Sequence, residues 1–245
     1  MVDIGNIDVI ILSNMKLEEL KELFKLNDKQ VKQLDTYANF LIDYNKKINL
    51  TAITNYEEII EKHFYDSLIP LLHKDIKGSL VDVGTGAGFP GVVIKIVKPD
   101  IKLVLLEPIN KRCLFLKELL NKLDIKDVDI INERGEDYSL KHREAYDYVT
   151  ARAVTNLNAL IEICGAMVKV NGYFIALRGK DGENEFKDAD LAIKTMGFEK
   201  EDTFIDKLSD DSIRLCSFLI KKTKTKKSFP RKYSIIKHEP ICQKL

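Results

Sequence analysis

The chain has 245 residues, of which 45% are hydrophobic and 31% are charged, and its formal net charge is +1. This length is enough for one α/β domain with additional elements, and the composition is typical of a globular protein. No apolar run approaches the roughly 18 residues that a membrane helix needs, so we expect no membrane association. The first residues include Asp3 and Asp8 and no Lys or Arg, so no secretory signal is visible and we expect a cytoplasmic protein.

The four cysteines are scattered along the chain and form no Cys-x-x-Cys pair: Cys113, Cys164, Cys216 and Cys242. This pattern is typical of reduced thiols that fill a core. We therefore expect neither a disulfide framework nor a metal site.

The charge is unevenly distributed. Residues 221–245 hold nine Lys or Arg and one acid, whereas the other 220 residues hold 30 basic and 37 acidic groups. A basic tail on an acidic body is typical of an enzyme that binds a polyanion. A solvated C-terminus has the same composition, and Phe229, Pro230 and Ile241 offer a third interpretation, in which the tail packs against the core.

The first part of the chain has only helical patterns. Residues 16–26 and 28–47 have apolar side chains at intervals of three and four. A third helical stretch, 56–72, is expected to be interrupted near Pro70. We therefore predict a helical extension over residues 1–78.

Strand and helix patterns then alternate through residues 79–222. The predicted strands cover 79–83, 101–106, 128–132, 146–150 and 173–178, with a final antiparallel pair at 198–205 and 213–220. The predicted helices cover 89–98, 110–124, 157–168 and 183–196. Strands separated by helices imply a mostly parallel sheet flanked by helices, with right-handed crossovers. We predict a Rossmann-like α/β core over this range and a basic tail at 223–245.

A glycine-rich turn joins the first strand to its helix, in the segment Asp82-Val83-Gly84-Thr85-Gly86-Ala87-Gly88-Phe89. In an arrangement of strand, glycine turn and helix, the backbone of the turn can contact an adenosine-containing cofactor at the N-terminus of the helix. The spacing here is Gly-x-Gly-x-Gly, whereas a dinucleotide fingerprint would place its third glycine at Phe89. The difference favours S-adenosylmethionine (AdoMet) as the cofactor and leaves an NAD-type oxidoreductase as the alternative.

The next predicted strand ends on an acid. Glu107 follows Gly88 at close to the roughly 20-residue spacing of the acid that binds ribose hydroxyls. A carboxylate suits this task because it accepts two hydrogen bonds from a cis-diol. Since ligands of such sheets bind beyond the carboxyl ends of the strands, Asp82, Gly84, Gly86, Gly88 and Glu107 are the expected cofactor-binding residues.

Several segments resemble the bacterial small-subunit ribosomal RNA methyltransferase G family, also called glucose-inhibited division protein B. They run from about residue 31 to the C-terminus and comprise residues 44–53, 63–68, 82–91, 110–112, 134–136, 150–153, 229–232 and 240–241. The resemblance implies methyl transfer from AdoMet to N7 of one guanine in 16S ribosomal RNA. It also implies a monomeric α/β enzyme whose partner is 16S ribosomal RNA or the small ribosomal subunit.

The resemblance implies roles for particular residues. Gly84 and Phe89 would line the path of the methionine and adenosine, and Gly135 and Glu136 would lie near the adenine. Arg152 would face both the cofactor and the target pocket, and it is the candidate catalytic residue. The candidate RNA contacts are Arg178, Lys180, Lys226, Arg231 and Lys232.

The chain departs from the family pattern at a few positions. The family usually has alanine where this chain has Gly135, and a Lys-Gly or Lys-Ala pair where it has Arg178-Gly179. These differences concern RNA contacts more than cofactor binding. The first 14 residues have no clear counterpart, so Met15 is a hypothetical alternative start.

The chemistry implied for guanine N7 needs no general base, because N7 carries a lone pair and no hydrogen. The enzyme's task is then to align an exposed base with the methyl donor. Arg152 is the best-placed polar group, and it can donate to guanine O6 while leaving N7 free. It can equally pair with a carboxylate or the cofactor, and the sequence leaves these alternatives open.

His63 and Asp66 lie one helical turn apart, which is compatible with acid–base chemistry. We favour a structural role, in which they brace the helical extension against the core. Asn49 and Thr51 are interpreted as turn residues whose side chains bond to backbone. A non-catalytic RNA-binding module remains a further alternative, although no motif is visibly broken.

Overall fold

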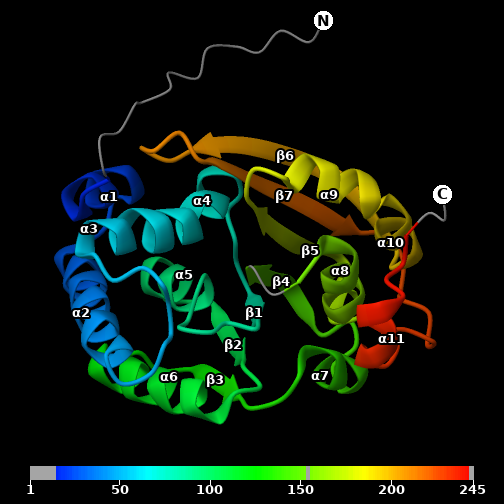
Figure 1. Cartoon of the computed structure of the whole chain (residues 1–245), viewed down its shortest axis with the longest axis horizontal. Helices are drawn as coiled ribbons and strands as arrows, with labels where there is room; N and C mark the ends of the chain where they lie inside the picture. The colour runs from blue at the N-terminus through cyan, green and yellow to red at the C-terminus, as the bar shows by residue number, and fades with distance from the viewer. Residues whose placement is uncertain (1–14, 153–154, 243–245) are drawn as a thin grey trace, which may run out of the picture.

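The computed structural model describes residues 15–152 and 155–242. Within these ranges, seven strands form one sheet in the order β3-β2-β1-β4-β5-β7-β6 (Figure 1). The strands are β1 Ser79–Val83, β2 Lys102–Leu106, β3 Val128–Ile131, β4 Tyr146–Arg152, β5 Val168–Arg178, β6 Phe198–Lys207 and β7 Ile213–Lys221. β1 to β5 pair in parallel and β7 pairs antiparallel with both β5 and β6. The predicted Rossmann-like, mostly parallel sheet is confirmed.

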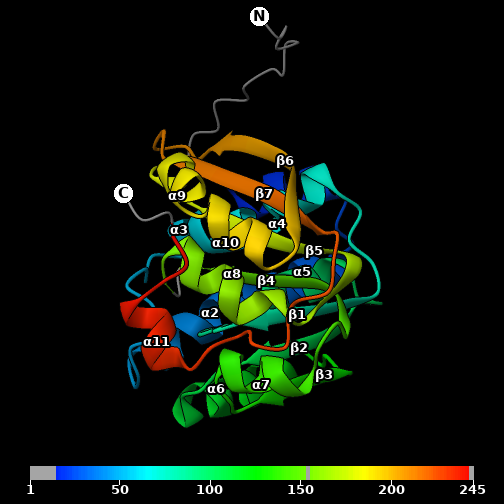
Figure 2. The ribbon, with the colours of Figure 1, turned by 90° about the vertical axis from the view of Figure 1, so that its right-hand side faces the viewer.

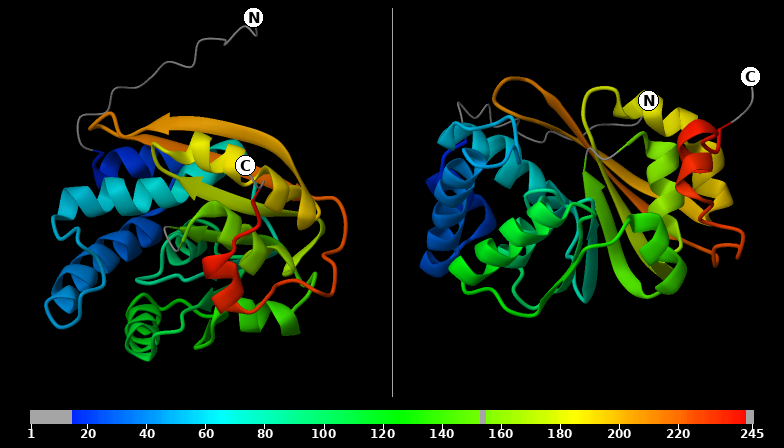
Figure 3. Two further views of the ribbon diagram at one scale, coloured as in Figure 1. Left: turned by 45° about the vertical axis from the view of Figure 1, so that its right-hand side comes forward. Right: turned by 60° about the horizontal axis from the view of Figure 1, so that its bottom comes forward.

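Two helical layers cover the sheet, one on each face (Figure 3). One layer contains α1 Leu17–Phe24, α2 Asp28–Asn45, α3 Tyr56–Ile59, the π-helical turn η1 Ile60–Tyr65, α4 Asp66–His73, α5 Gly91–Val97 and α6 Asn110–Lys122. The other contains α7 Gly135–Lys141, α8 Leu157–Gly165, α9 Gly182–Asp188, α10 Asp190–Thr195 and α11 Tyr233–His238. No helix of the described residues is long and apolar enough to cross a membrane.

The helical extension and the sheet share one hydrophobic core. Leu34 and Leu41 of α2 and Phe64 of η1 are fully buried and belong to the same apolar cluster as Val92 of α5 and Phe115 of α6. Figure 1 shows α2 running along α5 and α6. The extension is therefore part of the core rather than an appended domain.

The structure corrects several predicted boundaries. The third helical stretch is interrupted at η1 and not at Pro70, which lies inside α4. The predicted helix 183–196 is divided into α9 and α10. The short helix α7 was not predicted, because its seven residues are too few for a periodic pattern to show.

The expected basic tail is folded onto the α8 face. The Arg231 Nε and N–H groups donate to Glu162 Oε1 at 2.9 Å, and its NH2 donates to Oε2 at 2.7 Å. Glu162 is completely buried, as is the nearby Ile236. Figure 2 shows the C-terminal segment running beside α8 to α11. The interpretation that the tail packs against the core is confirmed, with Pro230 buried and Phe229 and Ile241 packed against the same cluster.

A buried lysine fixes the start of this segment. The Lys221 ammonium donates to Gly165 O at 2.8 Å, Met196 O at 2.5 Å and Thr225 Oγ1 at 2.5 Å. Its side chain is fully buried, and burial lowers its pKa to about 7. These three acceptors match the three N–H donors of an ammonium, so every donor of the protonated Lys221 has a hydrogen-bond partner.

Replacing Arg231 with Ala should destabilise the fold by about 3–5 kcal/mol, because it leaves the buried Glu162 carboxylate uncompensated. Urea unfolding measures the loss. Lys232→Ala is the matched control, since this neighbouring side chain is exposed. Equal stability of the two variants would contradict the anchoring role of Arg231.

Candidate functional site

The glycine turn after β1 lies against the end of β2. The backbone N–H groups of Gly84 and Thr85 both donate to Leu106 O, at 2.8 and 3.1 Å. Gly86 has φ +61°, and a Cβ built there meets nothing nearer than Gly84 O at 3.9 Å. A Cβ at Gly88, with φ +99°, would lie 2.7 Å from the Tyr37 hydroxyl. Gly86 therefore leaves room for a ligand, whereas Gly88 is required by packing.

Asp82 holds the turn from inside the sheet. Its Oδ2 accepts from Thr85 Oγ1 at 2.6 Å and from the Gly91 N–H at 2.8 Å, which joins the turn to the start of α5. Its Oδ1 is buried without a hydrogen-bond partner in the described part of the chain. Burial raises the pKa of this carboxyl to about 7. An unpaired buried acceptor beside an open glycine turn is compatible with a bound ligand that carries donors or positive charge.

Glu107 bonds directly to the glycine turn. Its Oε2 accepts from the Gly86 N–H at 3.0 Å, and its Oε1 accepts from the Ile109 N–H at 2.9 Å. The carboxylate is 1% exposed, and Arg112 lies 3.6 Å away. Each carboxylate oxygen has a second lone pair, so the group can still accept from a diol. The sequence predicted that this acid would lie beside the glycine turn, and the hydrogen bond from Gly86 confirms that position.

Gly135 and Glu136 begin α7, at the same edge of the sheet. A Cβ at Gly135 would lie 2.8 Å from both Ile163 and Val83, so glycine lets α7 approach α8 and β1 closely. Glu136 is buried and accepts from Arg134 Nε at 2.5 Å. The predicted position near a cofactor's adenine stays a prediction.

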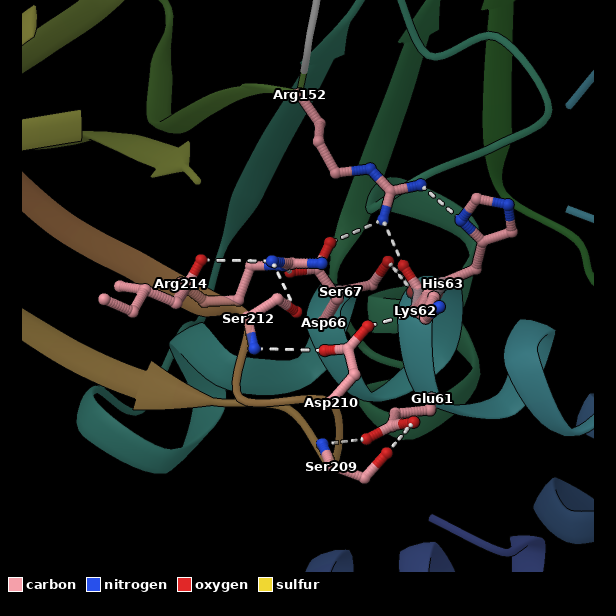
Figure 4. Close-up of polar contacts among 11 residues, drawn as sticks. Glu61, Lys62, His63, Asp66, Ser67, Arg152, Ser209, Asp210, Ser212 and Arg214 are labelled. Carbon is pink, nitrogen blue, oxygen red and sulfur yellow. Dashed lines mark hydrogen bonds and ion pairs between the residues drawn. The ribbon is translucent and has the colours of Figure 1, made fainter. Parts of the chain in front are cut away.

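Arg152 ends β4 and is held by the helical extension. Its NH1 donates to Asp66 Oδ2 at 2.8 Å, and its NH2 donates to His63 Nδ1 at 3.1 Å (Figure 4). Asp66 Oδ1 accepts from Arg214 Nε of β7 at 2.8 Å. The guanidinium also lies 4.9 Å from the centre of the Phe89 ring. The bracing role of His63 and Asp66 is confirmed, since both bind a residue of the sheet.

His63 connects Arg152 to the loop before α3. Burial, followed by the nearby charge of Arg152, lowers the His63 pKa to about 3, so the ring is neutral at physiological pH. Because Arg152 donates to Nδ1, we assign the ring proton to Nε2, which lies 2.8 Å from Thr51 Oγ1. Thr51 Oγ1 also accepts from the Ile53 N–H, as expected of a turn residue, whereas Asn45 rather than Asn49 bonds the neighbouring backbone.

Phe89 is buried between aromatic rings. It stacks on His63 at 4.4 Å and on Tyr37 at 5.4 Å, and only 5% of it is exposed. The structure thus shows Phe89 as a packing residue, and its expected place along the cofactor path stays a prediction. Phe89 follows the glycine turn, and its ring also contacts the Arg152 guanidinium, so this side chain links the turn to Arg152.

A pocket of ≈ 450 Å³ lies where β4, β5 and β7 meet η1. Its wall contains Arg152, Arg178 and Arg214 together with the carboxylates Asp66 and Glu185. The sequence analysis did not identify Arg214 and Glu185, because neither stands in a recognisable motif. Their position next to Arg152 follows only from strand order.

The candidate RNA contacts do not form a single cluster. Arg178 lines the pocket, donates to Thr155 O at 2.7 Å and is 8% exposed, while the adjacent Lys180 is exposed. Lys226 and Lys232 are exposed on the C-terminal segment, on the α8 side. Arg231 is bound to Glu162, so we withdraw it as an RNA contact. No cluster of metal-ligating side chains occurs in residues 15–152 and 155–242.

Comparison with known proteins identifies the family. The family model for rRNA small subunit methyltransferase G matches residues 30–214. The chain belongs to this family. A ribosomal RNA small subunit methyltransferase G from Clostridium botulinum is 43% identical over 220 residues, which cover 88% of this chain and 92% of that protein. One from Staphylococcus aureus is 39% identical over 232 residues, with coverages of 93% and 97%.

Solved structures share the fold. A SAM-dependent methyltransferase from Aquifex aeolicus has a TM-score of 0.52 at 17% identity and covers 73% of this chain and 98% of its own. M. jannaschii TYW2, solved in complex with AdoMet, has a TM-score of 0.52 at 11% identity, with coverages of 65% and 76%. The sheet therefore has the same fold as these methyltransferases. The open turn at Gly86 and the acceptors of Asp82 and Glu107 remain the place where we expect AdoMet to bind.

Replacing Glu107 with Ala should weaken AdoMet binding by about 1–3 kcal/mol, the usual effect of losing hydrogen bonds to a charged group. Isothermal titration calorimetry measures the affinity. Glu118→Ala, an exposed position on α6, is the control for the same truncation. An affinity equal to that of the wild type would place the ribose contact elsewhere.

Asp82 should make folding stability depend on pH. Its folded pKa of about 7 lies above the unfolded value of 3.8, so the folded state binds more protons between these values. This contribution to stability is present at low pH and is lost as pH rises toward 7, by up to about 1.4 kcal/mol per unit. Urea unfolding of wild type and Asp82→Asn from pH 5 to 8 checks it. The difference between the two proteins should change up to pH 7 and then level off, and a constant difference would refute the assignment.

Proposed function

We propose that this protein transfers the methyl group of AdoMet to N7 of a guanine in 16S ribosomal RNA. The observation that carries the proposal is the juxtaposition of the glycine turn and the arginine-rich pocket, which share Phe89 as their common support. Family membership supplies the substrate class. We further propose that the protein acts as a monomer in the cytoplasm on the RNA or the small subunit.

The residues for cofactor binding come from the ends of β1, β2 and β3. Gly86 leaves room for the cofactor to approach the backbone of the turn, and Glu107 provides acceptors for ribose hydroxyls. Gly135 and Glu136 begin the wall nearest β3, where we place the adenine. When bound, AdoMet supplies an electrophilic methyl group on a sulfonium.

Among the described residues, neither His63 nor Asp66 is free to act as a general base, which agrees with attack by a nitrogen that carries no proton. Both ring nitrogens of His63 already have partners, and both oxygens of Asp66 accept from arginines. What these residues supply is rigidity, because they fix Arg152 in one position. Catalysis then depends on holding the guanine in line with the methyl group.

Arg152 is proposed to contact the guanine. A guanidinium has five N–H donors, and the protein engages those that face Asp66, His63 and the Lys62 carbonyl. A remaining donor can bind guanine O6 while N7 stays free. Four basic residues are proposed to contact phosphates: Arg178 at the pocket, the exposed Lys180 two residues further along, and Lys226 and Lys232 on the C-terminal segment.

The test is methyl transfer from labelled AdoMet to small subunits of a strain that lacks this activity, followed by mapping of the modified nucleotide. Wild type should form 7-methylguanine at one position. Arg152→Ala should lower the rate by about 100-fold or more while AdoMet affinity stays nearly unchanged.

Lys117→Ala, at an exposed position of α6 that has no proposed role, is the control for the loss of one positive charge. A parallel loss of rate and AdoMet affinity in Arg152→Ala would assign Arg152 to the cofactor. Absence of 7-methylguanine with the wild type would refute the proposed activity.

A further inference from the structure

We propose that Tyr233, in the C-terminal segment, is a positioning residue for the cofactor site, where it holds Arg134 against Glu136. This role rests on the cofactor part of the proposed function, because it assumes that AdoMet binds with its adenine beside Gly135 and Glu136. It gives the C-terminal segment an effect on cofactor affinity in addition to the RNA contacts proposed above.

The wall formed by Gly135 and Glu136 lies next to the ends of β1 and β2. A Cβ at Gly135 would lie 2.8 Å from Val83, the residue before the glycine turn. Just before α7 begins, Asn132 Nδ2 donates to Glu107 O at 2.9 Å. These contacts bring the start of α7 to the residues that are expected to bind the cofactor.

Glu136 has Arg134 as its charge partner. The Glu136 carboxylate is buried, and Arg134 Nε donates to its Oε1 at 2.5 Å. The Arg134 side chain, by contrast, is 48% exposed. A long, exposed side chain has many rotamers to lose, so one hydrogen bond does not by itself fix the geometry of this pair.

Tyr233 supplies a second contact to the same guanidinium. The Arg134 guanidinium carbon lies 4.1 Å from the centre of the Tyr233 ring, which is within the range of a cation–π interaction. An arginine stacked on an aromatic face keeps the donors at its edge free for a carboxylate. Figure 1 shows α11, which begins at Tyr233, beside α7.

The Tyr233 ring is held by residues on either side of it in the C-terminal segment. Arg231 binds the buried Glu162, and Ile236 is completely buried. Tyr233 itself is 36% exposed, so it contributes little to the core. Truncating this ring should therefore release Arg134 without unfolding the segment.

The test measures AdoMet affinity of the full chain by isothermal titration calorimetry. Tyr233→Ala should weaken binding by about two- to fivefold, the range of one exposed cation–π contact. Tyr233→Phe keeps the ring and should bind as the wild type does. Ile235→Ala, at an exposed apolar position of the same helix, is the control and should also match the wild type.

A double-mutant cycle with Arg134→Ala separates positioning from a general loss of structure. If Tyr233 acts through Arg134, adding Tyr233→Ala to Arg134→Ala should weaken AdoMet binding no further. In methyl transfer, Tyr233→Ala should raise KM for AdoMet and leave kcat at saturating AdoMet unchanged. Melting temperatures verify that each variant is folded.

Several results would overturn the proposal. One is wild-type AdoMet affinity in Tyr233→Ala, and another is additive losses in the double variant. An equal loss of affinity in Ile235→Ala would mean that α11 acts only through stability. A loss of affinity for the small subunit alone would mean that the ring serves RNA binding instead.

Failure of the proposed function gives a different pattern. If wild type binds AdoMet but forms no 7-methylguanine, the activity is wrong, and the titrations still decide the role of Tyr233. If wild type binds no AdoMet, the cofactor assignment and the role of Tyr233 are both refuted. If wild type is active and Tyr233→Ala binds AdoMet equally well, only the role of Tyr233 is refuted.

Discussion

A single buried carboxylate, Asp66, joins three parts of the fold around the site. It lies at the start of α4 and accepts from Arg152 of β4 and Arg214 of β7, both at 2.8 Å. A buried charge pair adds little net stability, but removing one partner leaves a buried charge uncompensated, so such pairs fix a unique arrangement of their neighbours. The position of Arg152 therefore depends on the helical extension as much as on its own strand.

The extension also reaches the cofactor turn. Tyr37 of α2 donates to Ala87 O inside the turn, and its ring stacks on Phe89. His63 stacks on the other side of the same ring and accepts from Arg152. Because these side chains are buried and closely packed, a displacement of α2 or η1 would be transmitted to both the turn and the pocket. The helices before β1 thus serve the active site directly.

On the opposite face of the sheet, the C-terminal segment packs against the core, although its lysine-rich composition is typical of a solvated tail. Lys221 and Arg231 have most of their donors engaged by buried carbonyls and by Glu162. The other lysines that the structure describes in this segment are exposed, namely Lys222, Lys224, Lys226, Lys227, Lys232 and Lys237, so the segment combines a fixed backbone with a positive surface. Such a surface can approach a phosphate backbone with little further loss of conformational entropy.

The sequence alone determined the succession of strands along the chain, most of the helices between them, the glycine turn and the acid at Glu107, because hydrophobic period and turn chemistry are local properties. It also indicated the family from short motifs. Only the tertiary structure decided that His63 and Asp66 bind Arg152, that Arg231 binds Glu162, and that Glu185 borders the same pocket as Arg152. These partners are separated by long stretches of chain, so their pairing depends on strand order and helix packing, which no local pattern encodes.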